Sequence, residues 1–435
     1  MTVDLRTKLG PLTLKNPFVS AGGPVAGTLQ HIKNACDAGF GAIVTKTASY
    51  YGEFQKYPRP IYNIYDVRVS ADDPIGISEC GWMHNDHNSV YPPHQFAKFL
   101  PEAVEHCEKN DCVLIGSFAG AGMEQWERMA KDYVNAGVHA LELNFCCPYP
   151  QVMPETAKGD EHLIGQTFGD NPALGAEVIK RLKQIVNVPI FPKMPPTARK
   201  NIVDIAKMYK EAGADGITIY ANSMVLKIDI ETGQPMGWGA SIGSNHGHMV
   251  DTCQDTAKLA KEVEDFAIMS GRGARYWYDC IELLMAGAAS VQYSAAIHVY
   301  GLKHVKNMLA DMEKWLERKG YSSIEQVKGL ALPKIYRSAD VKNHVKPLVA
   351  KVDASKCIAC GRCAEVCFYD AAEIFVKNGK GAAKINQDNC AGCTICGQVC
   401  PKKCIDFTER KEEIEYLRAL GSAHPDLLPD IFEEK

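Results

Sequence analysis

The chain has 435 residues, of which 46% are hydrophobic and 23% charged, and its formal net charge is -4. This ordinary balance gives no reason to expect binding to nucleic acid or to a membrane surface. The first residues contain no apolar signal segment, and no apolar run approaches the ~20 residues that cross a bilayer, so we expect a cytoplasmic protein without a membrane span.

From Pro17 to Ser294 the sequence alternates short apolar runs with amphipathic stretches of helical period. The predicted strands are Pro17–Ala21, Ala42–Thr47, Val113–Phe118, Ala140–Phe145, Pro189–Lys193, Gly216–Tyr220, Phe266–Ser270 and Ala289–Ser294. The predicted helices include Glu124–Ala136, Ala173–Val186, Val203–Ala212, Thr252–Glu264 and Tyr278–Ala286. Eight strands, mostly separated by one helix each, predict an α/β fold in which the strands close into a (β/α)8 TIM barrel.

The long segment Tyr50–Lys98 does not follow this alternation. It is rich in Pro, His, Tyr and Asp, and it is too long for a plain connection between two strands, so we expect a loop that forms part of a site wall. A final helix is predicted over Gly301–Lys319. The expected domains are a catalytic barrel over residues 1–320, a linker over 321–350, a cysteine-rich domain over 351–410 and a tail over 411–435.

Cysteines are concentrated near the C-terminus, where nine of the 17 lie between Cys357 and Cys404. A C-x2-C-x2-C-x3-C run begins at Cys357 and again at Cys390, and in two-cluster ferredoxins the fourth cysteine of each run binds the other cluster. This spacing predicts a ferredoxin-like α+β domain with two 4Fe-4S clusters. One cluster would be held by Cys357, Cys360, Cys363 and Cys400, and the other by Cys390, Cys393, Cys396 and Cys367. Structural zinc is the alternative, and the additional Cys404 is expected only to pack.

Reactive and polar residues stand at the ends of the predicted barrel strands, where the active sites of such barrels lie. They are Lys46, Asn144, Cys147, Lys193, Asn222 and Ser223. A lysine can stabilise an anionic reduced flavin, asparagines can hold a planar substrate, and a cysteine can act as general acid or base. The alternatives are a packed thiol at Cys147 and helix-capping roles for Asn222 and Ser223.

The segment Leu141-Glu-Leu-Asn144-Phe-Cys-Cys147-Pro148 resembles the LELN-x-S-C-P loop of the dihydroorotate and dihydropyrimidine dehydrogenase family. Ile43-Val-Thr-Lys46-Thr, Ile190-Phe-Pro-Lys193-Met and Gln292-Tyr-Ser-Ala-Ala are similar to family segments that occur in the same order. The resemblance covers nearly the whole chain. It is closest to the bacterial NAD-dependent dihydropyrimidine dehydrogenase subunits that combine an FMN barrel with a C-terminal ferredoxin domain.

The resemblance implies FMN in the barrel and oxidoreduction of a CH–CH bond, with uracil and thymine as the first ring substrates to test. Cys147 would protonate one carbon of the double bond while flavin N5 delivers hydride to the other. The implied cofactor-binding residues are Ala21, Gly22, Lys46, Thr47, Asn144, Lys193, Asn222, Gly271, Arg272, Gly273, Tyr293 and Ser294. Backbone amides of 271–273 and 293–295 would hold the FMN phosphate. The implied substrate-binding residues are Asn85, Asn144, Tyr149, Asn222 and Ser223.

Four positions depart from the family pattern: Cys146 replaces a serine, Tyr149 follows the Cys-Pro pair, Gly243–His248 replaces a Gly-x-Ser-Gly stretch, and Arg272 interrupts a Gly-Gly pair. These departures leave dihydroorotate, another cyclic enone or another heterocycle as alternative substrates. A non-catalytic iron–sulfur electron-transfer subunit is the alternative of another class. No G-x-G-x-x-G fingerprint follows a strand, so we expect an NAD(P)H-oxidising flavoprotein subunit or a ferredoxin as the electron donor, and a homo- or hetero-oligomer.

Overall fold

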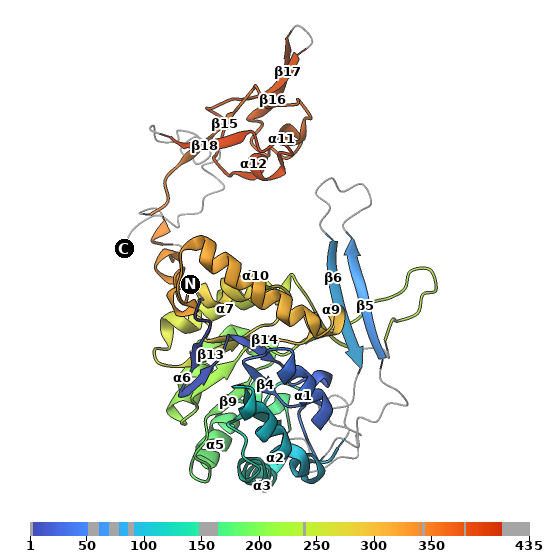
Figure 1. Ribbon diagram of the computed structural model, residues 1–435. Coiled ribbons are helices and arrows are strands. Elements are labelled where there is room, and N and C mark those ends of the chain that lie inside the picture. Colours follow the sequence, from blue (N-terminus) through green and yellow to red (C-terminus); the bar gives the residue numbers. More distant parts are fainter. Residues whose placement is uncertain are drawn as a thin grey trace, which may run out of the picture. The chain divides into compact units, whose positions relative to one another are not determined.

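The computed structural model describes residues 3–50, 61–68, 78–85, 91–147, 164–237, 241–337, 339–341, 344–377 and 380–410. The chain forms two compact units, Met1–Lys334 and Ile335–Lys435 (Figure 1). None of the helices within the described ranges is both long enough and apolar enough to cross a membrane.

The first unit is built on a closed barrel of eight parallel strands, which confirms the predicted fold class. The strands are β3 (Phe18–Ser20), β4 (Ala42–Val44), β7 (Val113–Phe118), β8 (Ala140–Asn144), β9 (Ile190–Lys193), β10 (Gly216–Thr218), β13 (Ala267–Ser270) and β14 (Ser290–Tyr293). Their spatial order is β10-β13-β14-β3-β4-β7-β8-β9. Each of them lies inside one of the eight predicted strands.

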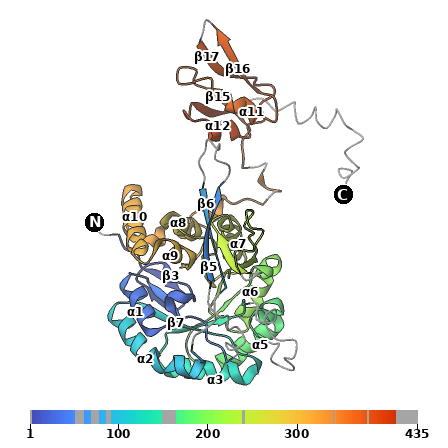
Figure 2. The ribbon, with the colours of Figure 1, turned by 90° about the vertical axis from the view of Figure 1, so that its right-hand side faces the viewer.

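Helices surround the barrel strands, as Figure 2 shows. They are α1 (Leu29–Asp37), α2 (Pro93–Lys109), α3 (Gly122–Asn135), α4 (Gln166–Asp170), α5 (Pro172–Lys183), α6 (Ile202–Glu211), α7 (His248–Glu262), α8 (Trp277–Met285), α9 (Ala295–Tyr300) and α10 (Lys303–Lys319). Gly137, just past α3, has a φ of 93°, and Gly287, just past α8, has a φ of 101°. Only glycine adopts such angles without strain, which explains the recurring Ala-Gly ends of the helices.

The N-terminal end of the barrel is closed by an antiparallel hairpin of β1 (Thr7–Leu9) and β2 (Leu12–Leu14). Leu9 and Leu14 are fully buried in one cluster with apolar barrel residues such as Val44 and Phe191. Because this end is filled by apolar side chains, a polar pocket can form only towards the carboxyl ends of the strands.

Two strands of a second sheet lie in the segment Tyr50–Lys98, so the expectation of a loop is wrong, although residues of this segment do line the pocket described below. β5 (Ile61–Arg68) pairs antiparallel with β6 (Ser78–Asn85), and Figure 1 shows them as two long neighbouring strands. β6 also pairs with β12 (Ser241–Asn245), which pairs with β11 (Ser223–Val225). The hydrogen-bonded partners of β6 thus come partly from far along the chain, and a local sequence pattern does not reveal them.

The first unit also extends beyond the expected start of the linker. A 3-10 helix, Ile324–Gln326, follows α10, and the side chains of Ile324 and Val327 are buried in the core of the barrel unit. Residues 321–334 therefore belong to the barrel unit, because their apolar side chains pack against it.

The second unit is a small α+β fold. β15 (Leu348–Val352) pairs antiparallel with β18 (Ile405–Glu409), and β16 (Ala372–Lys377) pairs antiparallel with β17 (Lys380–Ile385). Its two short helices are α11 (Arg362–Glu365) and α12 (Ile395–Val399). The core of this unit contains both cysteines and apolar side chains, among them Cys363, Cys396 and Ile405.

Candidate active site and cysteine cavities

A pocket lies at the carboxyl ends of the barrel strands and collects most of the residues expected from the sequence. They are Ala21, Gly22, Lys46, Thr47, Asn85, Asn144, Cys147, Lys193, Asn222, Gly271, Arg272, Gly273 and Ser294. Barrel strand ends supply most of this set because parallel strands in a barrel all end at the same face. Asn85 comes from β6 of the second sheet.

Two of the expected residues, Tyr293 and Ser223, do not line this pocket with their side chains. Tyr293 is 1% exposed, and its hydroxyl donates to the carbonyl oxygen of Tyr276 at 3.0 Å, so its side chain faces the core. The Ser223 hydroxyl accepts a hydrogen bond from Nη2 of Arg272 and so helps to hold the Arg272 side chain in the pocket lining. Tyr149 lies outside the described residues.

Asn144 organises the loop that carries the two neighbouring thiols. Its Oδ1 accepts hydrogen bonds from the backbone amides of Cys146 at 3.1 Å and Cys147 at 2.9 Å, and from the Cys146 thiol at 3.2 Å. Its Nδ2 donates to Thr47 Oγ1 at 2.9 Å and to Cys147 Sγ at 3.0 Å. The amide of Asn144 is thus engaged within the protein, and its local effect is to hold Cys147 in position.

The Cys147 thiol is unusually acidic. The pKa of Cys147 is lowered from 9.0 to about 7, and the main cause is a hydrogen bond from Cys146. The Asn144 amide and the positive charges of Lys193 and Lys46 lower this pKa further, whereas burial opposes them. Burial in turn raises the pKa of Cys146. Cys146, which departs from the family pattern, lines the same pocket. Cys147 is therefore the more acidic of the two thiols.

A buried ion pair stands beside the thiols. Lys193 Nζ lies 3.6 Å from Glu142 Oε1 and donates to Gln292 Oε1 at 2.8 Å. Glu142 is 1% exposed, and it accepts hydrogen bonds from Gln292 Nε2 at 2.6 Å and from Thr218 Oγ1 at 3.1 Å. The sequence interpretation did not include Glu142, although a carboxylate inside the apolar run of β8 was the signal that could have revealed it.

A glycine-rich turn and the buried Arg272 form the side of the pocket near β13 and β14, and a second buried arginine, Arg275, follows three residues further along the chain. A Cβ on Gly271 would lie 2.2 Å from the carbonyl oxygen of Gln292, and one on Gly273 would lie 2.5 Å from the amide of Met249. Burial lowers the pKa of Arg272 to about 10, and its Nε finds no partner among the described residues. Arg275 is 1% exposed, donates through Nη2 to the carbonyl of Ser244, and has no partner for Nε and Nη1 within the described ranges.

Buried N–H groups of this kind suit a phosphate, because a guanidinium can give an anion charge-assisted hydrogen bonds. The two glycines let this turn pack directly against the backbone of Gln292 and Met249. The turn therefore fits the phosphate of a flavin mononucleotide. Arg275 was not expected from the sequence, since nothing in its local pattern distinguishes it from a surface arginine.

The second sheet supplies the opposite wall. Trp82 is 1% exposed and stacks on His84 with ring centroids 4.2 Å apart and on His298 with centroids 4.8 Å apart. Asn85 Oδ1 accepts a hydrogen bond from Ser241 Oγ at 2.6 Å. Trp82, His84, Asn85 and Ser241 all line the pocket. Of these four residues, the sequence analysis named Asn85 individually. It assigned Trp82 and His84 to the wall only as part of Tyr50–Lys98, and it did not include Ser241.

The second unit contains two cavities, each lined by four of the expected cysteines. The first is lined by Cys357, Cys360, Cys363 and Cys400, and also by Cys404. The second is lined by Cys367, Cys390, Cys393 and Cys396. The Sγ atoms of Cys400 and Cys404 lie 3.5 Å apart, so the additional cysteine stands beside the first group. Backbone amides reach the sulfurs, for example from Ala383 to Cys357 at 3.3 Å. Four thiols around each cavity are a donor set that fits a 4Fe-4S cluster.

The family model of dihydroorotate dehydrogenases matches residues 4–316, and that of the 4Fe-4S dicluster domain matches residues 350–407. The chain is 27% identical over 377 residues to the NAD-dependent dihydropyrimidine dehydrogenase subunit PreA of Escherichia coli strain K12, covering 85% of this chain and 86% of the relative. It is 27% identical over 372 residues to the chloroplastic dihydropyrimidine dehydrogenase (NADP(+)) of Arabidopsis thaliana, covering 81% and 83%.

The chain is also similar to the catalytic subunit of dihydroorotate dehydrogenase B (NAD(+)) of Methanosarcina acetivorans, with 31% identity over 329 residues that cover 74% of this chain and 94% of the relative. Together with the barrel, its pocket and the cysteine-lined cavities, these matches show that the chain belongs to the dihydroorotate dehydrogenase family and is a flavin and iron–sulfur oxidoreductase acting on CH–CH bonds.

Proposed function

We propose that this enzyme reduces, or in the reverse direction forms, a C=C bond conjugated to carbonyl groups in a ring substrate, and that uracil or thymine is that substrate. The observation that carries the proposal is the acidic Cys147 thiol, whose sulfur lies 3.0 Å from Asn144 Nδ2 in a pocket that also contains Lys46 and Lys193. Two of the relatives are named dihydropyrimidine dehydrogenases, which supports a pyrimidine.

FMN, when bound, supplies a hydride equivalent from N5 to one carbon of the double bond. The Cys147 thiol gives its proton to the neighbouring carbon, so hydride and proton together saturate the bond and leave a thiolate that is protonated again from solvent. Asn144 is the positioning residue that keeps the sulfur in place. Lys193, oriented by Gln292 and Glu142, stabilises negative charge that develops in the pocket.

The remaining pocket residues divide between ring substrate and cofactor. Asn85 and Asn222 present side-chain amides, which can pair with the carbonyl and N–H groups of a planar ring. On the cofactor side, the residues assigned are Ala21, Gly22, Lys46, Thr47, Gly271, Arg272, Gly273 and Ser294. Arg275 joins this set through the unpartnered Nε and Nη1 described above.

The eight cysteines of the two cavities are proposed to hold two 4Fe-4S clusters in the pairing that the spacing predicts. Reducing equivalents would reach this chain from a separate NAD(P)H-oxidising flavoprotein subunit or a ferredoxin. The Escherichia coli relative is named as a subunit of an NAD-dependent enzyme, which favours a partner of that kind.

The test is anaerobic reoxidation of the reduced flavin. Protein with restored iron and sulfide is reduced, and flavin absorbance is followed while uracil, thymine and orotate are added in turn. We expect uracil or thymine, and not orotate, to reoxidise the flavin. Cys147→Ala should abolish this reoxidation without loss of bound flavin, whereas Cys253→Ala, which removes a thiol of α7 that does not line the pocket, should leave it intact. Normal reoxidation in Cys147→Ala would contradict the proton-transfer role.

Dihydroorotate is the second candidate substrate, favoured by the 31% identity to a dihydroorotate dehydrogenase catalytic subunit. The same experiment separates the two candidates. Reoxidation by orotate alone would make dihydroorotate the substrate. The role of Cys147 in proton transfer would then be tested with the Cys147→Ala protein and orotate.

A further inference from the structure

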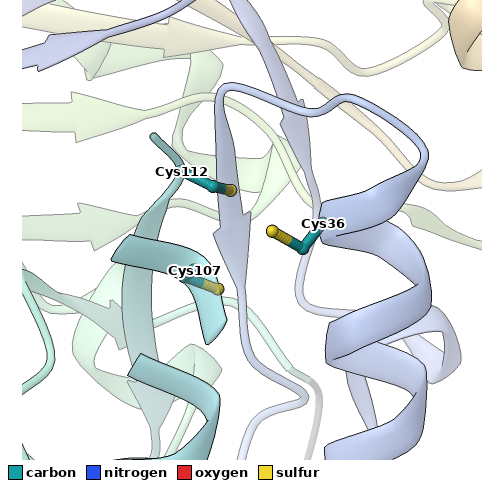
Figure 3. Close-up of side chains that lie close together, drawn as sticks. All are labelled: Cys36, Cys107 and Cys112. Atoms are coloured by element: carbon teal, nitrogen blue, oxygen red, sulfur yellow. The ribbon is translucent and has the colours of Figure 1, made fainter. Parts of the chain in front are cut away.

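Three cysteines meet on the outer side of the barrel, away from the pocket. Cys36 lies near the end of α1, Cys107 near the end of α2, and Cys112 just before β7. Their side chains are buried, and their sulfur atoms all lie within 4.8 Å of one another. Figure 3 shows the three thiols pointing toward one another from the two helices and the strand.

The backbone holds two of these cysteines side by side. The amides of Asn110 and Cys112 both donate to the carbonyl of Cys107, at 3.0 and 2.9 Å, and so close a tight turn between α2 and β7. α1 packs beside α2 and brings Cys36 to this turn. The arrangement therefore depends on regular elements and their hydrogen bonds, which makes it a preorganised donor set.

The sulfur atoms are close enough together to bind one metal ion. Zinc–sulfur bonds are about 2.3 Å long, so three thiolates around one ion lie roughly 4 Å apart. Thiolate ligands select soft ions such as Zn²⁺ and Cu⁺. A buried thiol that serves only for packing needs apolar neighbours, and it has no requirement for two further thiols at coordinating distance.

Other groups around the cluster are those expected at such a site. His106 Nε2 lies 2.8 Å from Asp37 Oδ1, and both of these side chains place a ligand atom within 4.8 Å of Cys36 Sγ. A histidine paired with a carboxylate is a common fourth ligand or outer-shell partner in zinc sites. Lys15 Nζ donates to the carbonyl of Asn110 in the same turn at 2.7 Å, and its positive charge offsets the excess negative charge of three thiolates around a divalent ion.

We propose that Cys36, Cys107 and Cys112 bind a thiophilic d10 metal ion, represented by Zn²⁺, at a structural site that joins the ends of α1 and α2 to the start of β7. Binding replaces three thiol protons by the ion, with no change of oxidation state, and so strengthens with rising pH. The site is separate from the pocket and from the two cysteine cavities of the second unit. Its effect is to stabilise the folded barrel, because the ion binds the native arrangement of thiols.

The experiment measures zinc in the flavin- and iron-loaded enzyme. Protein produced with added ZnSO4 is purified anaerobically, its iron and sulfide are restored, loosely bound metal is dialysed away, and zinc and iron are measured by mass spectrometry. We expect about one zinc per chain in the wild type. Cys36→Ser and Cys112→Ser should each retain less than about a tenth of that zinc and keep the same iron content. Cys280→Ser, at a buried cysteine of α8 outside the cluster, is the matched control and should retain the zinc.

Zinc X-ray absorption of the wild type gives a test that does not depend on any variant folding. Support requires a shell of three sulfurs at about 2.3 Å with at most one lighter neighbour. The proposal is overturned by wild-type protein without zinc, by zinc retained in both serine variants, or by a shell of four sulfurs, which indicates zinc in the cavities of the second unit. A disulfide between two of the three cysteines in the anaerobic protein overturns it as well. None of these outcomes depends on which substrate the pocket binds.

Discussion

Replacing Glu142 by glutamine removes the charge that faces Lys193 and leaves the size of the side chain nearly unchanged. The two charged atoms are 3.6 Å apart, and the side chains are 2% and 14% exposed. With an effective dielectric constant of about 20, their attraction amounts to about 5 kcal/mol. Removing one member of a buried pair typically costs about 3–5 kcal/mol. A glutamine can still accept hydrogen bonds from Thr218 and Gln292, so we expect the lower end of that range, about 3 kcal/mol of unfolding free energy.

Denaturant unfolding followed by tryptophan fluorescence measures this loss for the barrel alone, because all five tryptophans precede Lys334. The exposed pair Glu105–Lys109 is the control, and Glu105→Gln should cost less than about 1 kcal/mol. Changing Lys193 to methionine as well removes the unpaired buried cation, so the double variant should recover much of the stability. Equal losses of unfolding free energy for Glu142→Gln and Glu105→Gln would refute the argument that burial makes the Glu142–Lys193 pair stronger than an exposed pair.

Because the pKa of Cys147 is lowered to about 7, reoxidation of the reduced flavin by uracil should fall as pH rises through 7, by about tenfold per pH unit, since the acid form of the thiol is lost. Cys146→Ala removes the main cause of the shift and should move this midpoint up towards 9.0; a midpoint that stays near 7 in stopped-flow traces would argue against the assigned cause. Arg272→Met should weaken FMN binding by about tenfold or more, measured by fluorescence titration, and an unchanged dissociation constant would remove Arg272 from the phosphate site. Cys393→Ser should lower the iron content towards half of the wild-type value, whereas Cys404→Ala should leave it unchanged. Full iron content in Cys393→Ser would remove Cys393 from the ligands, and iron lost in Cys404→Ala would make Cys404 a ligand in the first cavity.

The barrel was predictable from the sequence because its strands are buried on both sides and therefore read as continuous apolar runs. Four of them, β4, β8, β10 and β14, also follow a helix that ends in glycine. The strand-end residues Lys46, Asn144 and Lys193 were predictable for a related reason. Once parallel strands close into a barrel, their carboxyl ends meet at one face whatever the details of packing. The grouping of the cysteines followed from their spacing in the same way.

The second sheet was not predictable because its register depends on distant partners. Ile242 of β12 pairs with His84 of β6, and neither segment has a strong strand pattern by itself. Tyr293 lies between Gln292 and Ser294, which both line the pocket. Since successive side chains of a strand point to opposite faces, the tyrosine side chain faces the core. The expectation for Tyr293 concerned its backbone amide, which the direction of the side chain does not test.

The pocket has two sources: strand ends of the barrel supply its lysines and thiols, and the separate β11-β12-β6-β5 sheet supplies Trp82, Asn85 and Ser241. Substitutions in that sheet can therefore accumulate without altering the barrel that positions Cys147. Under the proposed function, a change of ring substrate would require substitutions in residues 61–85 and 223–245, while the strand ends that hold Cys147 stay the same. Exchanging these two segments between relatives should therefore change substrate specificity without altering the barrel.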